Sequence, residues 1–161
     1  MNEILNLLGQ RNVAYQLVHH PAVYTAEEAD RYVTNYDFAR AKNLFLHNSR
    51  GFFLVMINDD QRLDMHLLKH RLATTRLSFA KPQDLENQLG IQTGAVSPFN
   101  LINDHYHQVT LVISQQLLDT NRLIGCHPND NTKMVILSFT DLIKIVCQWG
   151  NPVKIVNLAK E

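Results

Sequence analysis

The sequence predicts an α+β fold, a single compact domain with a mixed β-sheet flanked by helices. Strand-like apolar segments alternate irregularly with amphipathic segments, so hairpins and helices are mixed instead of repeating as β-α-β units. No internal repeat or low-complexity linker divides the chain. Its 161 residues, 45% of them hydrophobic, suffice for one buried core. We therefore expect residues 1–161 to form one domain.

Helices are expected where apolar residues recur every three to four positions and a capping residue or helix breaker marks an end. Thr25 and Glu28 fit a capping box, which starts one such helix. Pro82 and Gly90 suit the first turn and the C-terminal end of another. The helices expected on these grounds cover residues 3–11, 25–32, 64–72, 82–89 and 141–148.

Strands are expected where short apolar runs lie between turn-forming residues. The segment FFLVMI (52–57) is apolar throughout, which is typical of a central strand covered on both faces. It follows KNLFLH (42–47) after the turn-rich NSRG (48–51), so the two predict a β-hairpin. The expected strands cover residues 14–20, 42–47, 52–57, 109–114, 122–125 and 134–139.

Charge and cysteine content restrict the class of function. Lys plus Arg equals Asp plus Glu at 15 each, and a neutral chain is poorly suited to non-specific duplex binding, although a local patch can bind an RNA end. Cys126 and Cys147 are too few for a disulfide scaffold. No apolar run reaches the roughly 18 residues of a membrane helix, and the first residues lack the basic region of a signal peptide. We expect a cytoplasmic protein without membrane contact.

Three polar segments could carry chemistry. Lys42 and Asn43 open an expected strand, where a lysine is either a solvated strand end or an anchor for phosphate or carboxylate. Gly94 and Pro98 bracket a loop that is either an ordinary turn or a backbone cradle for a reacting carbonyl or water. His127 opens the run HPNDNT, which is either a polar turn or a site whose histidine orients a ligand near neutral pH.

The order of these segments resembles that of one known family. The matching pieces are YTAEEAD (24–30), AKNLFL (41–46), RLD (62–64), RLSFA (76–80), GAVSP (94–98), PFNLIND (98–104) and HPNDNT (127–132). Their order and spacing are similar to the YbaK/ProX aminoacyl-tRNA deacylases, and most similar to the PrdX, or ProXp-ala, branch that edits prolyl-tRNA. The resemblance covers residues 15–148. It implies a compact α+β domain that hydrolyses the ester between a wrong amino acid and the tRNA 3′ end, with no metal or other cofactor.

The resemblance also implies a substrate and partners. The ProXp-ala branch acts on alanyl-tRNA(Pro), so the expected partner is the 3′ acceptor end of tRNA-Pro, with possible contact to prolyl-tRNA synthetase. A synthetase pocket built for proline excludes alanine poorly, because each missing methylene is worth only about 1–3 kcal/mol. Relatives with the same core remove cysteine, serine or threonine. Those substrates remain open, as does a non-catalytic paralogue that binds tRNA or synthetase.

Roles of single residues are implied by position. Lys42 would hold the terminal phosphate or ribose, and His127 would bound a small amino-acid pocket. The backbone from Gly94 to Pro98 would cradle the ester carbonyl and the attacking water, with the substrate's own ribose hydroxyl helping to activate that water. The other residues implied to bind substrate are Asn43, Ala95, Val96, Ser97, Phe99 and Asn129. Two departures, Cys126 in place of a phenylalanine and Asn100 in place of a glycine, affect the expected pocket lining.

Two other chemistries are disfavoured. The metal-ligand types present, His19, His20, His105, His107, Cys126 and His127, lack zinc-finger or H-E-x-x-H spacing. A Cys126 nucleophile paired with His127 is also disfavoured, because neighbours along an extended chain point to opposite sides. We therefore expect neither a metal site nor a cysteine nucleophile.

Overall fold

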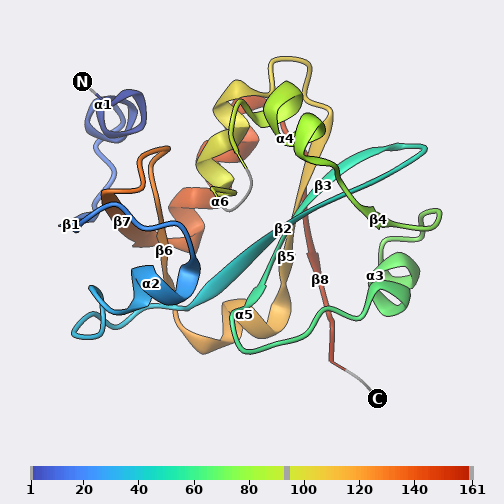
Figure 1. Ribbon diagram of the computed structural model, residues 1–161, viewed down its shortest axis with the longest axis horizontal. Coiled ribbons are helices and arrows are strands. Elements are labelled where there is room, and N and C mark those ends of the chain that lie inside the picture. The colour runs from blue at the N-terminus through green and yellow to red at the C-terminus, as the bar shows by residue number, and fades with distance from the viewer. Residues whose placement is uncertain (1, 93–94, 160–161) are drawn as a thin grey trace.

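The strands form two sheets instead of one (Figure 1). The computed structural model describes residues 2–92 and 95–159. An antiparallel three-stranded sheet has the order β1-β7-β6, and a five-stranded sheet has the order β4-β2-β3-β5-β8. The larger sheet is the mixed one, since β3 pairs antiparallel with β2 and parallel with β5. The strands are β1 (Gln16–His19), β2 (Ala41–Asn48), β3 (Gly51–Asn58), β4 (Ser78–Phe79), β5 (Val109–Ser114), β6 (Leu123–Cys126), β7 (Lys133–Ser138) and β8 (Val153–Val156).

Each expected helix is present, with ends set by capping groups. The hydroxyl of Thr25 accepts from the amide of Glu28, whose carboxylate accepts from the amide of Tyr24 instead of closing the expected box on Thr25. Gly90 adopts a left-handed conformation, φ 67°, where its helix ends. The helices are α1 (Glu3–Gln10), α2 (Ala26–Asp30), α3 (Met65–Arg71), α4 (Pro82–Leu89), the 3₁₀ helix η1 (Pro98–Asn103), α5 (Gln115–Thr120) and α6 (Phe139–Trp149).

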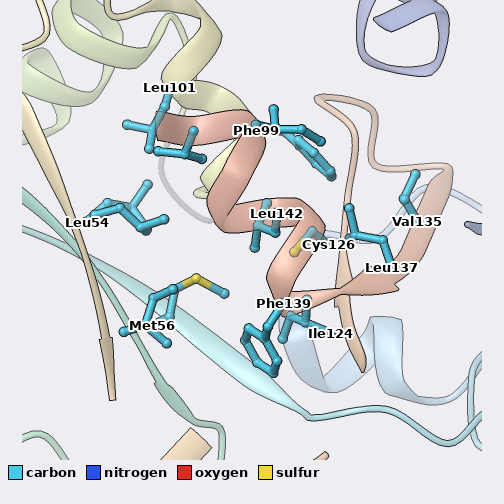
Figure 2. Close-up of a cluster of buried hydrophobic side chains, with 14 of the residues drawn as sticks. Leu54, Met56, Phe99, Leu101, Ile124, Cys126, Val135, Leu137, Phe139 and Leu142 are labelled. Carbon is cyan, nitrogen blue, oxygen red and sulfur yellow. The ribbon is translucent and has the colours of Figure 1, made fainter. Parts of the chain in front are cut away.

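Helix α6 lies between the two sheets and joins them through one core (Figure 2). Leu142 on α6 lies between Leu54 and Met56 of β3 on one side and Val135 and Leu137 of β7 on the other, and all five are buried. Full burial of such a side chain stabilises the fold by about 1.5–3 kcal/mol. The core therefore fixes β7, and the loop that precedes it, relative to the large sheet.

The opposite face of the large sheet carries a second core. Leu46 of β2 and Val55 of β3 pack there with Leu68 of α3, and all three are fully buried. The strand FFLVMI thus has apolar neighbours on both faces and lies between β2 and β5, as its composition predicts. Successive residues of β2 and β3 face different cores.

Four elements lie outside the sequence predictions: β4, η1, α5 and β8. Strand β4 has only two residues, and β8 is an edge strand with exposed Lys154 and Ile155, so neither shows a clear apolar period. Helix α6 begins at Phe139, because the hydroxyl of Ser138 accepts from the amide of Asp141 and so caps the helix. The strand expected over residues 134–139 therefore ends one residue earlier, because the apolar Phe139 belongs to the first turn of α6.

Candidate functional site

A cavity of about 900 Å³ opens between α1, the segment before α2, the segment after α4 and the β6–β7 loop. The first three segments supply most of the apolar wall, and the β6–β7 loop supplies the polar wall. The described residues that line the cavity are Asn2, Leu5, Val23, Tyr24, Ile91, Gln92, Ala95, His127, Asn129, Asp130, Asn131 and Lys133.

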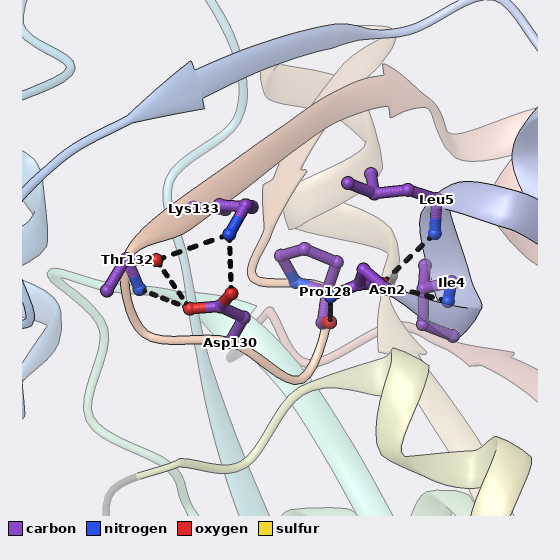
Figure 3. A network of polar contacts seen from close by, with 7 residues as sticks. All are labelled: Asn2, Ile4, Leu5, Pro128, Asp130, Thr132 and Lys133. Carbon is purple, nitrogen blue, oxygen red and sulfur yellow. Dashed lines mark hydrogen bonds and ion pairs between the residues drawn. The ribbon is translucent and has the colours of Figure 1, made fainter.

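The polar wall is braced by hydrogen bonds within the run HPNDNT and the residue after it (Figure 3). The carboxylate of Asp130 accepts from the Lys133 ammonium at 2.6 Å and from the Thr132 hydroxyl at 2.6 Å and amide at 2.8 Å. The hydrogen bond from Lys133, followed by those from Thr132, lowers the pKa of Asp130 to about 2. Asp130 is thus ionised near neutral pH and holds the loop closed.

His127 begins this loop, and its two ring nitrogens lie buried in the protein interior. Neither nitrogen makes a hydrogen bond of standard geometry to a described residue, although the backbone of Val96 and Ala95 lies close enough to act on the ring. Burial lowers the pKa of His127 below 6.5, outweighing the opposing effect of the nearby backbone of Val96 and Ala95. The imidazole is therefore neutral near pH 7, with one nitrogen able to donate and the other able to accept.

The loop from Ala95 onward is locked to the polar wall. The hydroxyl of Ser97 donates to the carbonyl of His127 at 2.8 Å and accepts from the amide of Phe99 at 3.3 Å. The side chain of Asn100 accepts from the amide of Ser97 at 2.6 Å and donates to the side-chain oxygen of Asn129 at 2.6 Å. Asn129, at φ 60°, donates in turn to the carbonyl of Phe99 at 3.3 Å.

The segment GAVSP (94–98), here called the GxxxP loop, and the following Phe99 do not all reach the cavity. Ala95 lines the cavity, whereas Ser97, Pro98 and Phe99 are buried and are not among its lining residues. The Ser97 side chain makes its contacts within the protein and Phe99 belongs to the core, so these side chains hold the loop where we had expected substrate contact. Gly94 lies outside the described residues.

Lys42 and Asn43 face opposite sides of β2. Asn43 pairs in register with Met56 of the first core, and Lys42 pairs with Ile57 of the second core. Asn43 donates to the carbonyl of Val96 at 3.1 Å, and its side-chain oxygen is buried without a partner among the described residues. The structure thus joins Asn43 to the GxxxP loop and places Lys42 on the other face of the sheet.

Burial makes Cys126 unsuited to act as a nucleophile near neutral pH. Cys126 is 3% exposed and belongs to the core, where burial raises the pKa of its thiol far above neutral pH. Among residues 2–92 and 95–159, no group of three or more His, Cys, Asp or Glu side chains is arranged to hold a metal ion.

No helix within residues 2–92 and 95–159 is both long and apolar enough to cross a membrane.

Sequence reasoning missed most of the apolar wall, and it assigned Asn100 to the pocket lining, whereas the structure shows that Asn100 locks the loop. Asn2, ahead of an amphipathic helix, is a capping signal, but nothing in the sequence indicates that α1 borders a cavity. Tyr24 lines the cavity and is 72% exposed, which no pattern distinguishes from an ordinary surface residue. Ala95, His127 and Asn129 are the predicted site residues that reach the cavity among those described.

Comparison with known proteins agrees with the earlier resemblance. Residues 20–145 match the family described as the aminoacyl-tRNA editing domain. The chain is 37% identical over 158 residues to the prolyl-tRNA editing protein ProX of Acetoanaerobium sticklandii, covering 96% of this chain and 95% of that protein. It is 30% identical over 146 residues to prolyl-tRNA synthetase associated domain-containing protein 1 of Danio rerio, covering 89% of this chain and 79% of that protein.

A solved structure shares the fold. The crystal structure of a candidate trans-editing enzyme for prolyl tRNA synthetase superposes with a TM-score of 0.72 at 18% identity, covering 97% of this chain and 95% of that one. The match confirms the predicted α+β architecture with a mixed sheet flanked by helices. With the sequence matches above, it shows that the chain belongs to the aminoacyl-tRNA editing domain family.

Proposed function

We propose that the protein is a trans-editing aminoacyl-tRNA deacylase that removes alanine from mischarged tRNA(Pro). One observation carries this proposal: the ring nitrogens of His127 and the side-chain oxygen of Asn43 are buried without partners, and both groups flank the backbone at Val96. A buried polar group without a partner costs about 1–3 kcal/mol. A ligand in the cavity would recover that cost if a small rotation of either side chain brought these atoms into contact with it.

The size of the cavity supports a substrate larger than an amino acid. About 900 Å³ lies in the upper part of the 300–1,000 Å³ range typical of small-molecule sites. We infer that it accepts the amino acid together with the terminal ribose and base of the RNA. The substrate would enter by its 3′ acceptor end, with the ester beside His127 and Ala95.

The proposed reaction is attack of water on the ester carbonyl carbon. The bond from that carbon to the ribose oxygen breaks, the ribose oxygen takes up one proton of the water, and the amino acid leaves as its carboxylate after the other proton passes to solvent. Once its ring has rotated toward the cavity, neutral His127 would accept a hydrogen bond from the water or from the substrate's amino group. The backbone from Gly94 to Pro98 is proposed to hold the carbonyl, and the substrate's neighbouring ribose hydroxyl to help position the water.

Lys42 is proposed to act on the RNA outside the cavity. Its position on the opposite face of β2 from Asn43 suits a phosphate of the acceptor end better than the ester itself. None of the ion pairs between described residues involves Lys42, so its ammonium is not committed to a protein carboxylate there. We further propose that residues 1–161 act as one editing domain in the cytoplasm, with transient contact to prolyl-tRNA synthetase.

The test is deacylation of a panel of tRNA(Pro) molecules charged with alanine, cysteine, serine, threonine or proline. We expect fast release of alanine, slower release of the other small residues and none of proline. Chelator treatment should leave the rate unchanged, and a chelator-sensitive rate would favour a metal mechanism. If every ester survives while the protein still binds tRNA, it is a non-catalytic paralogue and the hydrolase proposal is wrong.

A further inference from the structure

Helix α1 contributes to the cavity although it precedes the residues that match the family, 20–145. We infer that α1 is part of the substrate-binding site, where Leu5 contacts the terminal nucleoside of the RNA and Asn2 positions both Leu5 and the polar wall. The inference rests on the proposed function, because it concerns the same cavity.

Helix α1 is fixed to the body of the protein and is not a loose appendage. Ile4 and Leu8, one turn apart, are 1% and 0% exposed and belong to the main core. Burial of each stabilises the fold by about 1.5–3 kcal/mol. Leu5, which follows Ile4, is only partly buried and lines the cavity. The core therefore fixes the position of Leu5 at the cavity.

Asn2 links this wall to the loop that holds His127 (Figure 3). Its side-chain oxygen accepts from the amides of Ile4 at 2.9 Å and Leu5 at 3.1 Å, which caps the helix. Its side-chain nitrogen donates to the carbonyl of Pro128 at 2.9 Å, across 126 positions of sequence. The side-chain amide of Asn2 thus caps α1 and also fixes the position of Pro128, the residue after His127.

The chemistry of the two walls determines which part of the substrate lies against α1. Leu5, Val23 and Ile91 offer no hydrogen bonds from their side chains, whereas the β6–β7 loop carries Asn129, Asp130 and Lys133. The charged amino group and the ester need polar partners, and a nucleobase face is satisfied by apolar contact. The nucleoside therefore fits the α1 side, and the aminoacyl group fits the loop side.

The experiment uses an unreactive probe, 3′-deoxy-3′-(L-alanylamino)adenosine, in which an amide replaces the ester. Its dissociation constant is measured by NMR titration with the full chain and its variants. Leu5→Ala should weaken binding at least about tenfold, because apolar contact area is lost. Leu7→Ala is the matched control, since Leu7 lies on the same helix and packs against the core without lining the cavity. It should bind the probe as wild type does.

Asn2→Asp separates positioning from helix stability. Aspartate retains the acceptor that caps α1 but removes the donor to Pro128. We expect a several-fold weaker probe affinity and altered His127 resonances, with a fall in melting temperature no larger than the loss of one partly buried hydrogen bond causes. The inference is overturned if Leu5→Ala and Leu7→Ala bind the probe equally well.

The outcomes for α1 and for the proposed function are separable. If wild type deacylates alanyl-tRNA(Pro) while Leu5→Ala retains probe affinity, the function stands and the role of α1 is wrong. If wild type deacylates nothing but binds the probe through Leu5, the α1 site stands and the hydrolase proposal is wrong. Absence of both deacylation and probe binding overturns both.

Discussion

The hydroxyl of Ser97 donates a hydrogen bond to the backbone carbonyl of His127 at 2.8 Å, across 30 positions of sequence. The GxxxP loop and the HPNDNT run, which the sequence presents as separate segments, are thereby one physical unit. Two of the segments whose order suggested the family are therefore in direct contact.

Replacement of Ser97 by alanine should weaken this unit. Ser97→Ala removes the donor to His127 and the acceptor for the amide of Phe99, in a place where water does not compensate. We expect a loss of about 1–3 kcal/mol in the free energy of unfolding, measured by urea denaturation, and slower deacylation. Ser114→Ala is the control, because Ser114 is equally buried but bonds Gln116 away from the cavity. Equal deacylation by the two variants would contradict the coupling.

Asn100 should matter more than its neighbour of the same type. Asn100→Ala leaves the amide of Ser97 and the side-chain oxygen of Asn129 without their partner, so the polar wall keeps only the bond from Asn129 to Phe99 as a side-chain link to η1. We expect lower kcat with a smaller change in KM. Asn103→Ala, which loses only a bond to the carbonyl of Leu89, should retain the wild-type rate. An Asn100→Ala enzyme with unchanged kcat would show that the anchor is dispensable.

The burial of His127 predicts a pH-dependent stability. The pKa of His127 in the folded protein is lowered below 6.5. As pH falls below 6.5, the histidine therefore binds a proton more readily in the unfolded chain than in the folded one. The free energy of unfolding should therefore fall between about pH 7 and about pH 5. Nearby Asp130 opposes the shift and His20 adds to it. In His127→Gln this part of the pH dependence should vanish. If urea denaturation shows that the free energy of unfolding changes with pH equally in the variant and the wild type, this prediction is wrong.

The two cysteines should respond differently to an alkylating reagent. Both are free, and Cys147 is exposed whereas Cys126 is buried in the core. Mass spectrometry of the folded protein treated with iodoacetamide should find label on Cys147 alone. Deacylation should persist after labelling and in Cys126→Ala, apart from the cost of a small core cavity. Abolished turnover in a folded Cys126→Ala protein would revive the nucleophile hypothesis.

Lys42 and Asn43 should differ in kinetic effect because they face opposite sides of β2. We expect Lys42→Ala to raise KM for tRNA and to reduce the dependence of KM on salt, since it removes a phosphate contact. Lys42→Arg should restore much of the affinity. Asn43→Ala should lower kcat, because its side chain bonds the GxxxP loop at Val96. Identical effects of the two alanine variants would show that both residues act at one place.

The sequence predicted those parts of the fold that rest on local patterns. The hairpin of β2 and β3 and the central position of β3 were readable from turn residues and an unbroken apolar run. The division into two sheets was not, because β5 and β7 have similar composition and only long-range packing around α6 assigns them to different sheets.

The site was predictable only where its chemistry is concentrated in one segment. His127 and Asn129 stand in the most polar run of the chain, and both reach the cavity. Ser97 and Phe99 lie in a recognisable loop but face inward, which depends on the capping of η1 by Ser97. Leu5 gives no signal at all, since a partly buried leucine on an amphipathic helix is normally a core residue.

The cavity draws its described walls from four stretches of the chain, which contribute residues 2 and 5, residues 23 and 24, residues 91, 92 and 95, and residues 127, 129–131 and 133. During translation these segments leave the ribosome far apart in time, and the polar wall emerges last among them. A nascent chain that has completed only β5 lacks His127 and also lacks the β7 and α6 residues of the core against which α1 packs, so neither wall can yet be in its final place. The protein acquires its proposed activity late in its own synthesis.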